Sequence, residues 1–579
     1  RDCLLSRGLG DVYKRQTQKR EPFHEKNQHL CQIITFSKST SMKQISNYKA
    51  WAFCIAMLLT TTWLSAQTDT SIPKLIQKNG RYTLLVDNKP FFVLGGQCGN
   101  SSNWAYMLPN VWNVMKEMHA NTLEIPVYWE QLEPQEGKFD FSQVQSVLNQ
   151  ARQNNMRLIF LWFATWKNGS NHYMPEWMKT DSKKYPNVVG KNGQEVDSPS
   201  PHCEEAMKAD AKAFARFMGY LKEADTQHTV IMVQVENEPG TWGSVRDYSK
   251  KAQKLFEGSI PQEILTPTVC KELNVPKNAK GSWKEVFGER ADEYFHAWYV
   301  ARYINYVAKA GKEIYPLPLY INVALRDPLT NPTADHYESG GATDNVISIW
   351  KAAAPDIDFV APDIYLRDDK AVLKVLELYA RPDNALMVPE TIGSPRFLYH
   401  TIAKGIGFSP FGVDQRRNFS PDMQRQSPLS AEYEILKPMA HLLAEWSAED
   451  RIHPVIEPSD HSEQYVSLGS WKAIIKFGNT RGGQTAAAEK RPANGKAMII
   501  QLGENEFIGI GTNCRFTFEP IGKKQGKAWQ YLKVQEGFYD ENGDFKMLRI
   551  LNGDQTDWGG PQVCLLYTSD AADDLIGVD

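Results

Sequence analysis

Short apolar runs recur along the middle of the chain, and each ends abruptly in polar residues. The clearest covers 229–240, TVIMVQVENEPG, in which Val, Ile and Met lead into two glutamates, an asparagine, a proline and a glycine. Such a run is typical of a strand buried on both faces, as in a parallel sheet covered by helices. The run 385–390, ALMVPE, also closes on a glutamate. Both runs therefore predict buried strands with an acidic end.

Between these runs, apolar residues recur at the three- and four-residue spacing of amphipathic helices. The combined pattern predicts eight strands, at 92–95, 122–127, 157–163, 229–235, 317–323, 357–361, 385–389 and 405–411. Strands that alternate with helices in this way predict a (β/α)8 TIM barrel. An open doubly wound sheet is the alternative, but no Gly-rich phosphate-binding loop follows the first predicted strand.

The pattern changes on either side of the barrel. A β-hairpin with an Asp-Asn turn is predicted over 78–92, and a closing helix over 431–446. From about residue 453, short alternating runs separated by Gly and Asn predict an antiparallel β-sandwich. We therefore expect a barrel domain over 67–450 and a smaller sandwich domain over 451–563, which could be truncated. The long stretches 165–202 and 241–283 are expected to lie over the C-terminal face of the barrel.

A secretory signal peptide is predicted over 42–66, because two lysines precede an apolar centre and small residues end it at Ser65 and Ala66. The apolar centre, 50–59, is shorter than the roughly 20 residues of a membrane-spanning helix. We therefore expect cleavage after Ala66, export to the periplasm or the extracellular space, and no membrane span in the mature chain.

The two ends of the chain carry a different kind of signal. The segments DVYKRQ (11–16) and CLLYTSDAADD (564–574) look like translated adaptor sequence from DNA library preparation. Because a signal peptide belongs at an N-terminus, residues 1–41 are expected to be spurious upstream translation. Residues 564–579 are expected to be an adaptor-like tail.

Composition narrows the possible partners. The net charge of −3 gives no basic surface for nucleic acid. The four cysteines outside the expected artefacts and signal peptide are widely separated, so they allow either disulfides or buried free thiols. They are Cys98, Cys203, Cys270 and Cys514. No zinc-ligand spacing is present, and we predict no metal and no cofactor.

The predicted topology gives the two acidic strand ends a shared chemistry. The C-terminal ends of barrel strands converge on one mouth, so Glu238 and Glu390 are expected to face each other there. Glycoside hydrolysis needs one acid to protonate the leaving oxygen and one carboxylate at the anomeric carbon. We predict Glu238 as the acid/base and Glu390 as the nucleophile, with retention of configuration if the carboxyls are about 5 to 5.5 Å apart. Solvated acids at ordinary strand ends are the alternative.

The residues around this pair also resemble a known family. Asn237-Glu238-Pro239 resembles the Asn-Glu-Pro of clan A retaining glycosidases, and VQVENEPG resembles VQVENEYG of family 35 β-galactosidases, with Pro239 in place of Tyr. Trp129-Glu130 and LEPQEGKFDF (132–141) resemble the stretch after the second strand in families 35 and 42. The likeness covers about 78–446, and the sandwich resembles an uncharacterised domain attached to some bacterial members.

This resemblance implies an exported retaining exo-β-glycosidase that removes terminal sugars from a carbohydrate substrate, with β-galactosidase favoured. Pro239 weakens the case for galactose more than the case for hydrolysis. Another clan A specificity, such as β-xylosidase, β-glucosidase or endo-glycanase, stays open. A non-catalytic glycan-binding protein is the alternative of another class, and the presence of both Glu238 and Glu390 argues against it.

Further candidates lie at other predicted strand ends. Asn237 is predicted to hydrogen-bond the sugar 2-hydroxyl. Glu236 is expected to be a buried structural acid with a partner. Six more residues are predicted to line the sugar subsite, although packing or loop solvation explains each equally well. They are Tyr128, Glu130, Trp166, Asn322, Asp363 and Tyr365.

Overall fold

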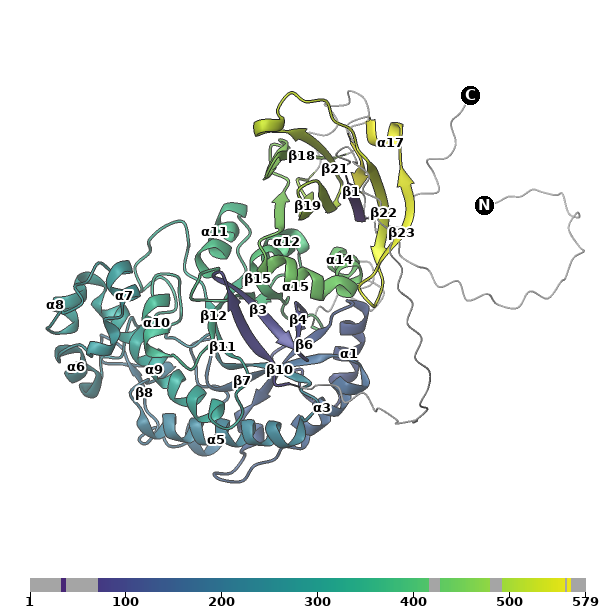
Figure 1. Ribbon diagram of the computed structural model, residues 1–579. Helices are drawn as coiled ribbons and strands as arrows, with labels where there is room; N and C mark the ends of the chain where they lie inside the picture. The colour runs from purple at the N-terminus through teal and green to yellow at the C-terminus, as the bar shows by residue number, and fades with distance from the viewer. Residues whose placement is uncertain (1–32, 38–70, 416–426, 479–491, 558–559, 564–579) are drawn as a thin grey trace, which may run out of the picture.

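The computed structural model describes residues 33–37, 71–415, 427–478, 492–557 and 560–563 (Figure 1). The predicted signal peptide and the adaptor-like tail lie outside these residues, as does most of 1–41. Those predictions therefore stay predictions.

Eight parallel strand positions form the central barrel, as predicted. In sheet order they are β5 (Val93–Gln97), β6 (Thr122–Tyr128), β7 (Arg157–Lys167), β10 (Val230–Asn237), β11 (Leu319–Ala324), β12 (Phe359–Ile364), β13 (Leu386–Val388) with β14 (Glu390–Thr391), and β15 (Gly405–Phe408). β13 pairs with β15 and β14 pairs with β12, so the seventh strand closes the ring. Pro389, which has no N–H to donate, separates its two segments.

The barrel strands are apolar on both sides because two apolar layers meet at them. Ile159 and Leu161 of β7 face the barrel interior, where Tyr320 and Phe359 stack with ring centroids 5.1 Å apart. Trp162, from the other face of β7, stacks on Phe217. The covering helices are α1 (Leu108–Glu117), α3 (Ser142–Gln153), α5 (Glu204–Ala224), α9 (Ala291–Lys312), α10 (Ile347–Ala353), α11 (Asp369–Tyr379) and α12 (Leu398–Lys404). This double burial explains why the strands read as continuous apolar runs.

Long insertions follow two barrel strands at their C-terminal ends, as the sequence predicts. The insertion after β7 contains α4 (Glu176–Lys179), β8 (Asn187–Val189) and β9 (Glu195–Pro199). The insertion after β10 contains α6 (Lys250–Glu257), η1 (Gln262–Ile264), α7 (Pro267–Glu272), α8 (Trp283–Phe287) and η2 (Gly288–Arg290). In Figure 1, α6, α7 and α8 lie together at one side of the barrel. The Ser198 hydroxyl donates to the Gly240 carbonyl at 2.9 Å and joins the two insertions.

A small antiparallel sheet packs against the barrel interior. It consists of β2 (Lys74–Lys78), β3 (Arg81–Val86) and β4 (Lys89–Phe91), one strand more than the predicted hairpin. Asp87 and Asn88 form the predicted turn with φ angles of 52° and 59°. Leu84 and Val86 join the apolar cluster inside the barrel. The N-terminal sheet therefore shares the core of the barrel.

The C-terminal domain is a two-sheet sandwich, as predicted. The closing helix is broken near Pro438 into α14 (Pro428–Leu436), η4 (Lys437–Met439) and α15 (Ala440–Ala448). One sheet has the order β16 (Ile452–Ile456), β19 (Lys496–Gly503), β20 (Glu506–Thr512), β1 (Ile33–Ser37), β22 (Lys533–Tyr539) and β23 (Phe545–Leu551). The other has the order β17 (Gln464–Leu468), β18 (Trp471–Phe477), β21 (Cys514–Pro520) and β24 (Gln562–Val563).

One strand of the sandwich comes from the far end of the sequence. β1 lies between β20 and β22 and is antiparallel to both. It belongs to the stretch 1–41 that the sequence predicts to be upstream translation. No sequence pattern indicated that this stretch would add a strand to the sandwich.

Charged residues join the two domains. Arg396 binds Asp369 through two hydrogen bonds of 2.8 and 2.6 Å and also donates to the Glu457 and Ala493 carbonyls. Buried Lys496 of the sandwich forms an ion pair with buried Glu432 of α14 at 2.5 Å.

The four cysteines considered above are all buried free thiols, namely Cys98, Cys203, Cys270 and Cys514. No described helix has both the length and the apolar composition needed to cross a membrane.

Candidate active site

Three buried carboxylates meet at the C-terminal ends of β10, β12 and β14. They belong to Glu238, Asp363 and Glu390, and one oxygen of each lies within 4.8 Å of the others. Asp363 and Glu390 are direct neighbours in the pairing of β12 with β14, while Glu238 follows β10. The structure therefore brings together the two glutamates that the sequence predicts as a pair and adds an aspartate.

The backbone at the end of β10 is strained. Glu236 and Glu238 have φ angles of 65° and 42°, in the left-handed region that residues with a side chain rarely adopt. The register between β10 and β7 shifts between Val235 and Asn237, as at a β-bulge. Bulges next to active sites re-aim a side chain. Here the irregular backbone directs Glu238 toward the mouth.

Asn322 of β11 supports this strained segment. Its Oδ1 accepts a hydrogen bond from the Glu238 backbone N–H at 2.8 Å, and its Nδ2 donates to Asp363 Oδ2 at 2.6 Å. Both polar ends of the buried amide are thus engaged by the site. Asn322 holds two members of the carboxylate cluster in place.

Glu390 accepts two hydrogen bonds, one on each oxygen. The Tyr365 hydroxyl donates to Oε1 at 2.6 Å, and Gln97 Nε2 donates to Oε2 at 3.2 Å. Burial and the charge of Glu238 raise the pKa of Glu390, while Lys167, Tyr365 and Gln97 oppose the shift. These donors favour the ionised form, which a nucleophile requires.

The surroundings of Asp363 disfavour the ionised form of its carboxyl. Burial, followed by the charges of Glu390 and Glu238, raises its pKa well above the usual value. Three carboxyls this close in a buried site cannot all be ionised at neutral pH. The cluster therefore holds at least one proton, and a glycosidase acid needs a proton to donate.

Lys167 supplies positive charge at the edge of this cluster. Its Nζ donates to Asn237 Oδ1 at 2.8 Å, and the cation lowers the pKa of both Asp363 and Glu390. Asn237 Nδ2 is buried and has no hydrogen-bond partner among the described residues. That amide is free to donate to a sugar hydroxyl, as the sequence predicts.

Three other predicted residues occupy different surroundings. Tyr128 is buried, accepts a hydrogen bond from the Asn103 N–H at 3.1 Å and stacks on Tyr173 and Trp104. Glu130, in α2 (Trp129–Leu132), is exposed and forms an ion pair with Lys179 at 2.8 Å. The Trp166 ring packs edge-on against Tyr303 of α9 with centroids 4.7 Å apart, in the layer between sheet and helices. The structure thus gathers Asn237, Asn322, Asp363 and Tyr365 around the glutamates, but not Glu130 or Trp166.

Glu236 is a buried structural acid, in agreement with the sequence. Its Oε2 accepts a hydrogen bond from the Trp166 N–H at 2.7 Å. Burial and neighbouring Asp210 raise its pKa well above the usual value. Asp210 in turn accepts hydrogen bonds from Trp162 and Thr165 at 2.9 and 2.5 Å. This pair lies on the helix side of the sheet and braces the strained end of β10.

Sequence reasoning missed several residues of the site. Gln97 and Lys167 are the last residues of β5 and β7, and the predicted third strand stopped short of Lys167. Extending the first apolar run to its first polar residue would have found Gln97, whereas in β7 the first polar residue is Thr165 and Lys167 lies two residues further on. Glu338, in the loop after β11, has no sequence pattern that marks it.

The carboxylate cluster also raises the question of a metal ion. Among the described residues, Glu238, Asp363 and Glu390 form the one group of three whose oxygens could coordinate such an ion. However, Tyr365, Gln97 and Asn322 already donate hydrogen bonds to Glu390 and Asp363. This donor set suits carboxylates that handle protons and carry out nucleophilic attack, so no metal is assigned.

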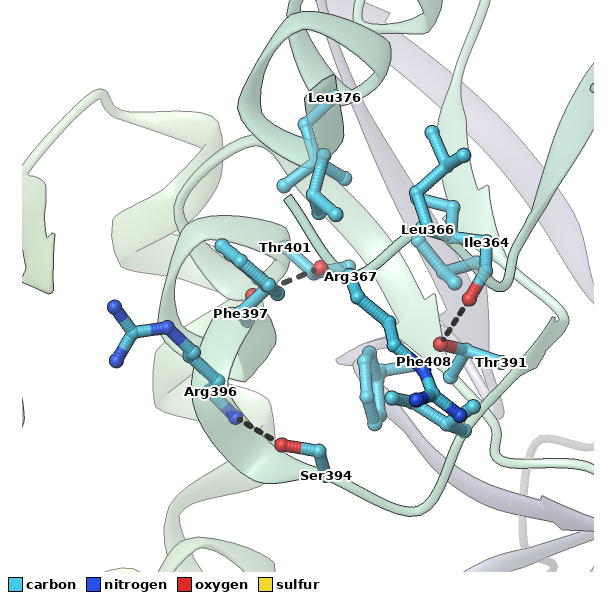
Figure 2. A pocket seen from close by; sticks show the side chains of 13 residues that line it. Ile364, Leu366, Arg367, Leu376, Thr391, Ser394, Arg396, Phe397, Thr401 and Phe408 are labelled. Atoms are coloured by element: carbon cyan, nitrogen blue, oxygen red, sulfur yellow. Dashed lines mark hydrogen bonds between the residues drawn. The ribbon is translucent and has the colours of Figure 1, made fainter. Parts of the chain in front are cut away.

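A separate pocket lies behind the strand that carries Glu390. It is a mostly apolar cavity of about 110 Å³, bounded by Val388 and Thr391 on one side and by residues of α11 and α12 on the other (Figure 2). The Thr391 hydroxyl donates to the Ile364 carbonyl at 2.7 Å along its wall. Because Val388 belongs to the layer between sheet and helices, this pocket is distinct from the barrel mouth.

Comparison with protein families matches two segments of the chain. Residues 107–308 match the glycoside hydrolase family 42 model, described as Beta-galactosidase. By this match, the chain carries a segment similar to family 42 glycoside hydrolases. Glu238 lies inside the matched range, and Glu390 lies beyond it. Residues 429–560 match a domain of unknown function, DUF5597.

Solved structures similar to the chain include other glycoside hydrolases. The β-galactosidase from Bacillus circulans sp. alkalophilus is 13% identical, with 61% of this chain and 57% of that chain covered and a TM-score of 0.43. The β-galactosidase from Rahnella sp. R3 is 17% identical over 62% and 58%, with a TM-score of 0.43. The β-amylase catalytic domain from Paenibacillus polymyxa is 11% identical over 60% and 98%, with a TM-score of 0.44. The chain thus spans less than three-fifths of either β-galactosidase. No curated protein matches it.

Proposed function

We propose that the chain is a retaining exo-β-glycosidase that hydrolyses terminal β-linked sugars, with galactose as the first candidate. The convergence of Glu238, Asp363 and Glu390 within 4.8 Å supports this proposal. A close pair of carboxyls suits double displacement, whereas inverting enzymes need about 6.5 to 9.5 Å to admit a water molecule. The family 42 match supports the choice of sugar.

In the first step, Glu238 protonates the glycosidic oxygen while Glu390 attacks the anomeric carbon. The bond to the leaving group breaks, and an ester forms between the sugar and Glu390. Tyr365 and Gln97 hold the attacking carboxylate through their hydrogen bonds to its two oxygens. The leaving group departs as a neutral alcohol, and Glu238 is left ionised.

In the second step, Glu238 acts as the base. The ester at Glu390 carries no charge, so Glu238, which the first step left ionised, no longer faces a second carboxylate at Glu390. Glu238 can then take a proton from water, whose oxygen attacks the anomeric carbon and releases Glu390. Two inversions give a product with the configuration of the substrate.

The proposal is tested with nitrophenyl glycosides and two variants of the nucleophile. We expect Glu390→Gln and Glu390→Ala to lower kcat by several orders of magnitude, and azide to restore part of the activity of Glu390→Ala as an α-glycosyl azide is released, because azide attacks from the side of the missing carboxylate with one inversion. Glu377→Gln, on the exposed side of α11, is the matched control. Unchanged turnover in Glu390→Gln would contradict the proposal, as would a sugar product of inverted anomeric configuration, measured by NMR with the wild type.

The same panel separates the alternatives. Preferred hydrolysis of a β-xyloside or β-glucoside would assign another clan A specificity, and cleavage limited to internal bonds of a polymer would assign an endo-glycanase. Binding of these sugars, measured by calorimetry, without turnover would assign a glycan-binding protein.

Export is tested by fractionating cells that express the Met42-initiated chain. Retention of the protein in the cytoplasm would contradict the prediction of a signal peptide.

A further inference from the structure

A fourth carboxyl lies close to the acid/base, and no step of the mechanism uses it. Glu338 belongs to the loop between β11 and α10 and is only 3% exposed. Thr241 and Ser339 exchange backbone hydrogen bonds of 2.8 and 3.1 Å, which fasten this loop to the segment after Glu238. The position of Glu338 is therefore fixed by backbone pairing to the end of β10.

Two glycines make room for the Glu338 side chain. A Cβ at Gly240 would lie 2.7 Å from Glu338 Cγ, and a Cβ at Gly169 would lie 2.4 Å from Glu338 Oε1. Gly169 is itself tied to the acid/base, because its N–H donates to the Glu238 carbonyl at 3.1 Å. The loops after β7, β10 and β11 thus converge on a single carboxyl.

The Glu338 carboxyl makes no well-formed hydrogen bond. Neither oxygen meets the geometry of a hydrogen bond with a described residue, although the Trp242 indole lies near enough to act on it as a donor. Burial and then the charge of Glu238 raise its pKa well above the usual value, while the Trp242 donor and the charge of Lys167 oppose the shift. A buried carboxyl with so few donors is costly, so a fold that retains one has acceptors to offer a ligand with hydroxyl groups.

The carboxyl lies on the Glu238 side of the site. It packs against Gly240 and Gly169, which flank Glu238, whereas Glu390 lies across the site beside Asp363. In double displacement the acid/base stands between the sugar and the departing alcohol. A group placed beyond Glu238 therefore faces that alcohol.

Trp242 provides an apolar face at the same place. Its indole Cδ1 and the Glu338 carboxyl carbon both lie 3.2 Å from the point where a Cβ of Gly169 would be. Trp242 is 52% exposed and lies beside the carboxyl. Gly243, with a φ of 81°, follows Trp242 directly. Exposed indoles stack on the apolar faces of sugar rings, so the Trp242 indole can contact a bound sugar.

We propose that Glu338 and Trp242 form a leaving-group subsite and that the leaving group is itself a sugar. This rests on the proposed function. The indole moves aside to stack on the ring of the departing sugar, and the uncovered carboxyl accepts hydrogen bonds from two of its hydroxyls. The substrate is then an oligosaccharide with a sugar on both sides of the cleaved bond.

The test compares two substrates that share the cleaved sugar and differ in the leaving group, namely a disaccharide and the corresponding glycosyl fluoride. For Glu338→Gln and Trp242→Ala, we expect kcat/KM on the disaccharide to fall about 10- to 100-fold, and kcat/KM on the fluoride to change less than about twofold. Trp242→Phe should recover part of the loss, because a ring remains. Glu263→Gln is the control, because Glu263 is exposed on the insertion after β10 that also contains Trp242.

Transfer to an acceptor sugar gives a second readout. The glycosyl-enzyme can pass its sugar to an added sugar hydroxyl, whose proton goes to Glu238, and this acceptor must occupy the leaving-group subsite. We expect the ratio of transfer to hydrolysis to fall in Glu338→Gln. Equal losses on both substrates, or an unchanged disaccharide rate with unchanged transfer, would overturn the subsite. Failure of the wild type to cleave either substrate would instead overturn the proposed function.

Discussion

Asn322 accepts a hydrogen bond from the backbone N–H of Glu238 at 2.8 Å, and this contact fixes a residue whose φ angle is 42°. The other end of the same amide donates to Asp363 at 2.6 Å. One buried side chain of β11 therefore sets the position of the Glu238 backbone and of the neighbouring Asp363 carboxyl. The proposed chemistry depends on a contact between two adjacent barrel strands.

We expect Asn322→Ala to act mainly on kcat. Without the amide, Glu238 loses the acceptor for its N–H, and misplacement of a catalytic group by about 1 Å costs about 100-fold in rate. The measurement is kcat and KM on a nitrophenyl glycoside, together with urea unfolding. Asn305→Ala is the matched control, because both ends of the Asn305 amide are also hydrogen-bonded, in this case to the single residue Asp356, away from the mouth. Equal kinetic losses in the two variants would show that Asn322 acts only through stability.

Tyr365→Phe is expected to raise the pKa of Glu390. The Tyr365 hydroxyl donates to Glu390 and lowers this pKa, so its loss leaves the opposing effect of burial stronger. The acidic limb of kcat/KM against pH should move to higher pH, and kcat/KM should fall about 10- to 100-fold. Tyr306→Phe on α9 is the control, because Tyr306 and Tyr365 are both 45% exposed. An acidic limb that stays in place would contradict the proposed role.

Lys167→Met should leave the carboxylate cluster more protonated. The Lys167 cation lowers the pKa of Asp363, Glu390 and Glu338, and methionine keeps the length of the side chain without its charge. The pH optimum for hydrolysis should therefore move upward, which a pH series of initial rates would detect. Lys179→Met, which breaks the exposed pair with Glu130, should leave the optimum unchanged. A downward shift in Lys167→Met would contradict this reading of the charges.

Glu124, inside the barrel, is expected to make stability depend on pH. Burial raises its pKa to about 8, while the nearby Ser409 hydroxyl and a hydrogen bond from the Tyr320 hydroxyl at 3.1 Å oppose the shift. Between the usual glutamate pKa and pH 8, the folded chain holds a proton that the unfolded chain releases, so the free energy of unfolding falls as pH rises. A shift of this size corresponds to roughly 5 kcal/mol at most.

Glu124→Gln removes this titration. Its free energy of unfolding, measured in urea, should improve relative to the wild type between pH 5 and pH 8. Glu377→Gln, on the exposed side of α11, should show no such trend. If the free energies of unfolding of Glu124→Gln and the wild type differ by a constant amount across this pH range, the prediction is wrong.

Much of the fold followed from local patterns. A strand buried on both faces must be apolar throughout, so runs such as LIFLWF in β7 and VIMV in β10 could be recognised in isolation. The turn at Asp87 and Asn88 was also readable, because these residues tolerate positive φ angles. Helices that alternate with such strands leave few topologies, and the barrel is one of them.

The candidate site was predictable only where topology places a residue. Glu238 and Glu390 end their strands, and the ends of parallel barrel strands share one mouth. Trp166 was predicted there by the same logic, but its ring lies against Tyr303, because successive side chains of a strand point to opposite faces. Which face each residue takes at a bulge is not visible in the sequence.

By itself, the sequence determined the barrel, the sandwich and the two acidic strand ends, because hydrophobic periodicity and strand polarity are local properties. Only the tertiary structure decided that Asp363 joins the pair, that Asn322 and Lys167 support it, and that Glu338 lies buried beside Glu238. These relations join different strands and loops. They exist only after the ring closes, because their distances depend on how the elements pack rather than on the order of residues along the chain.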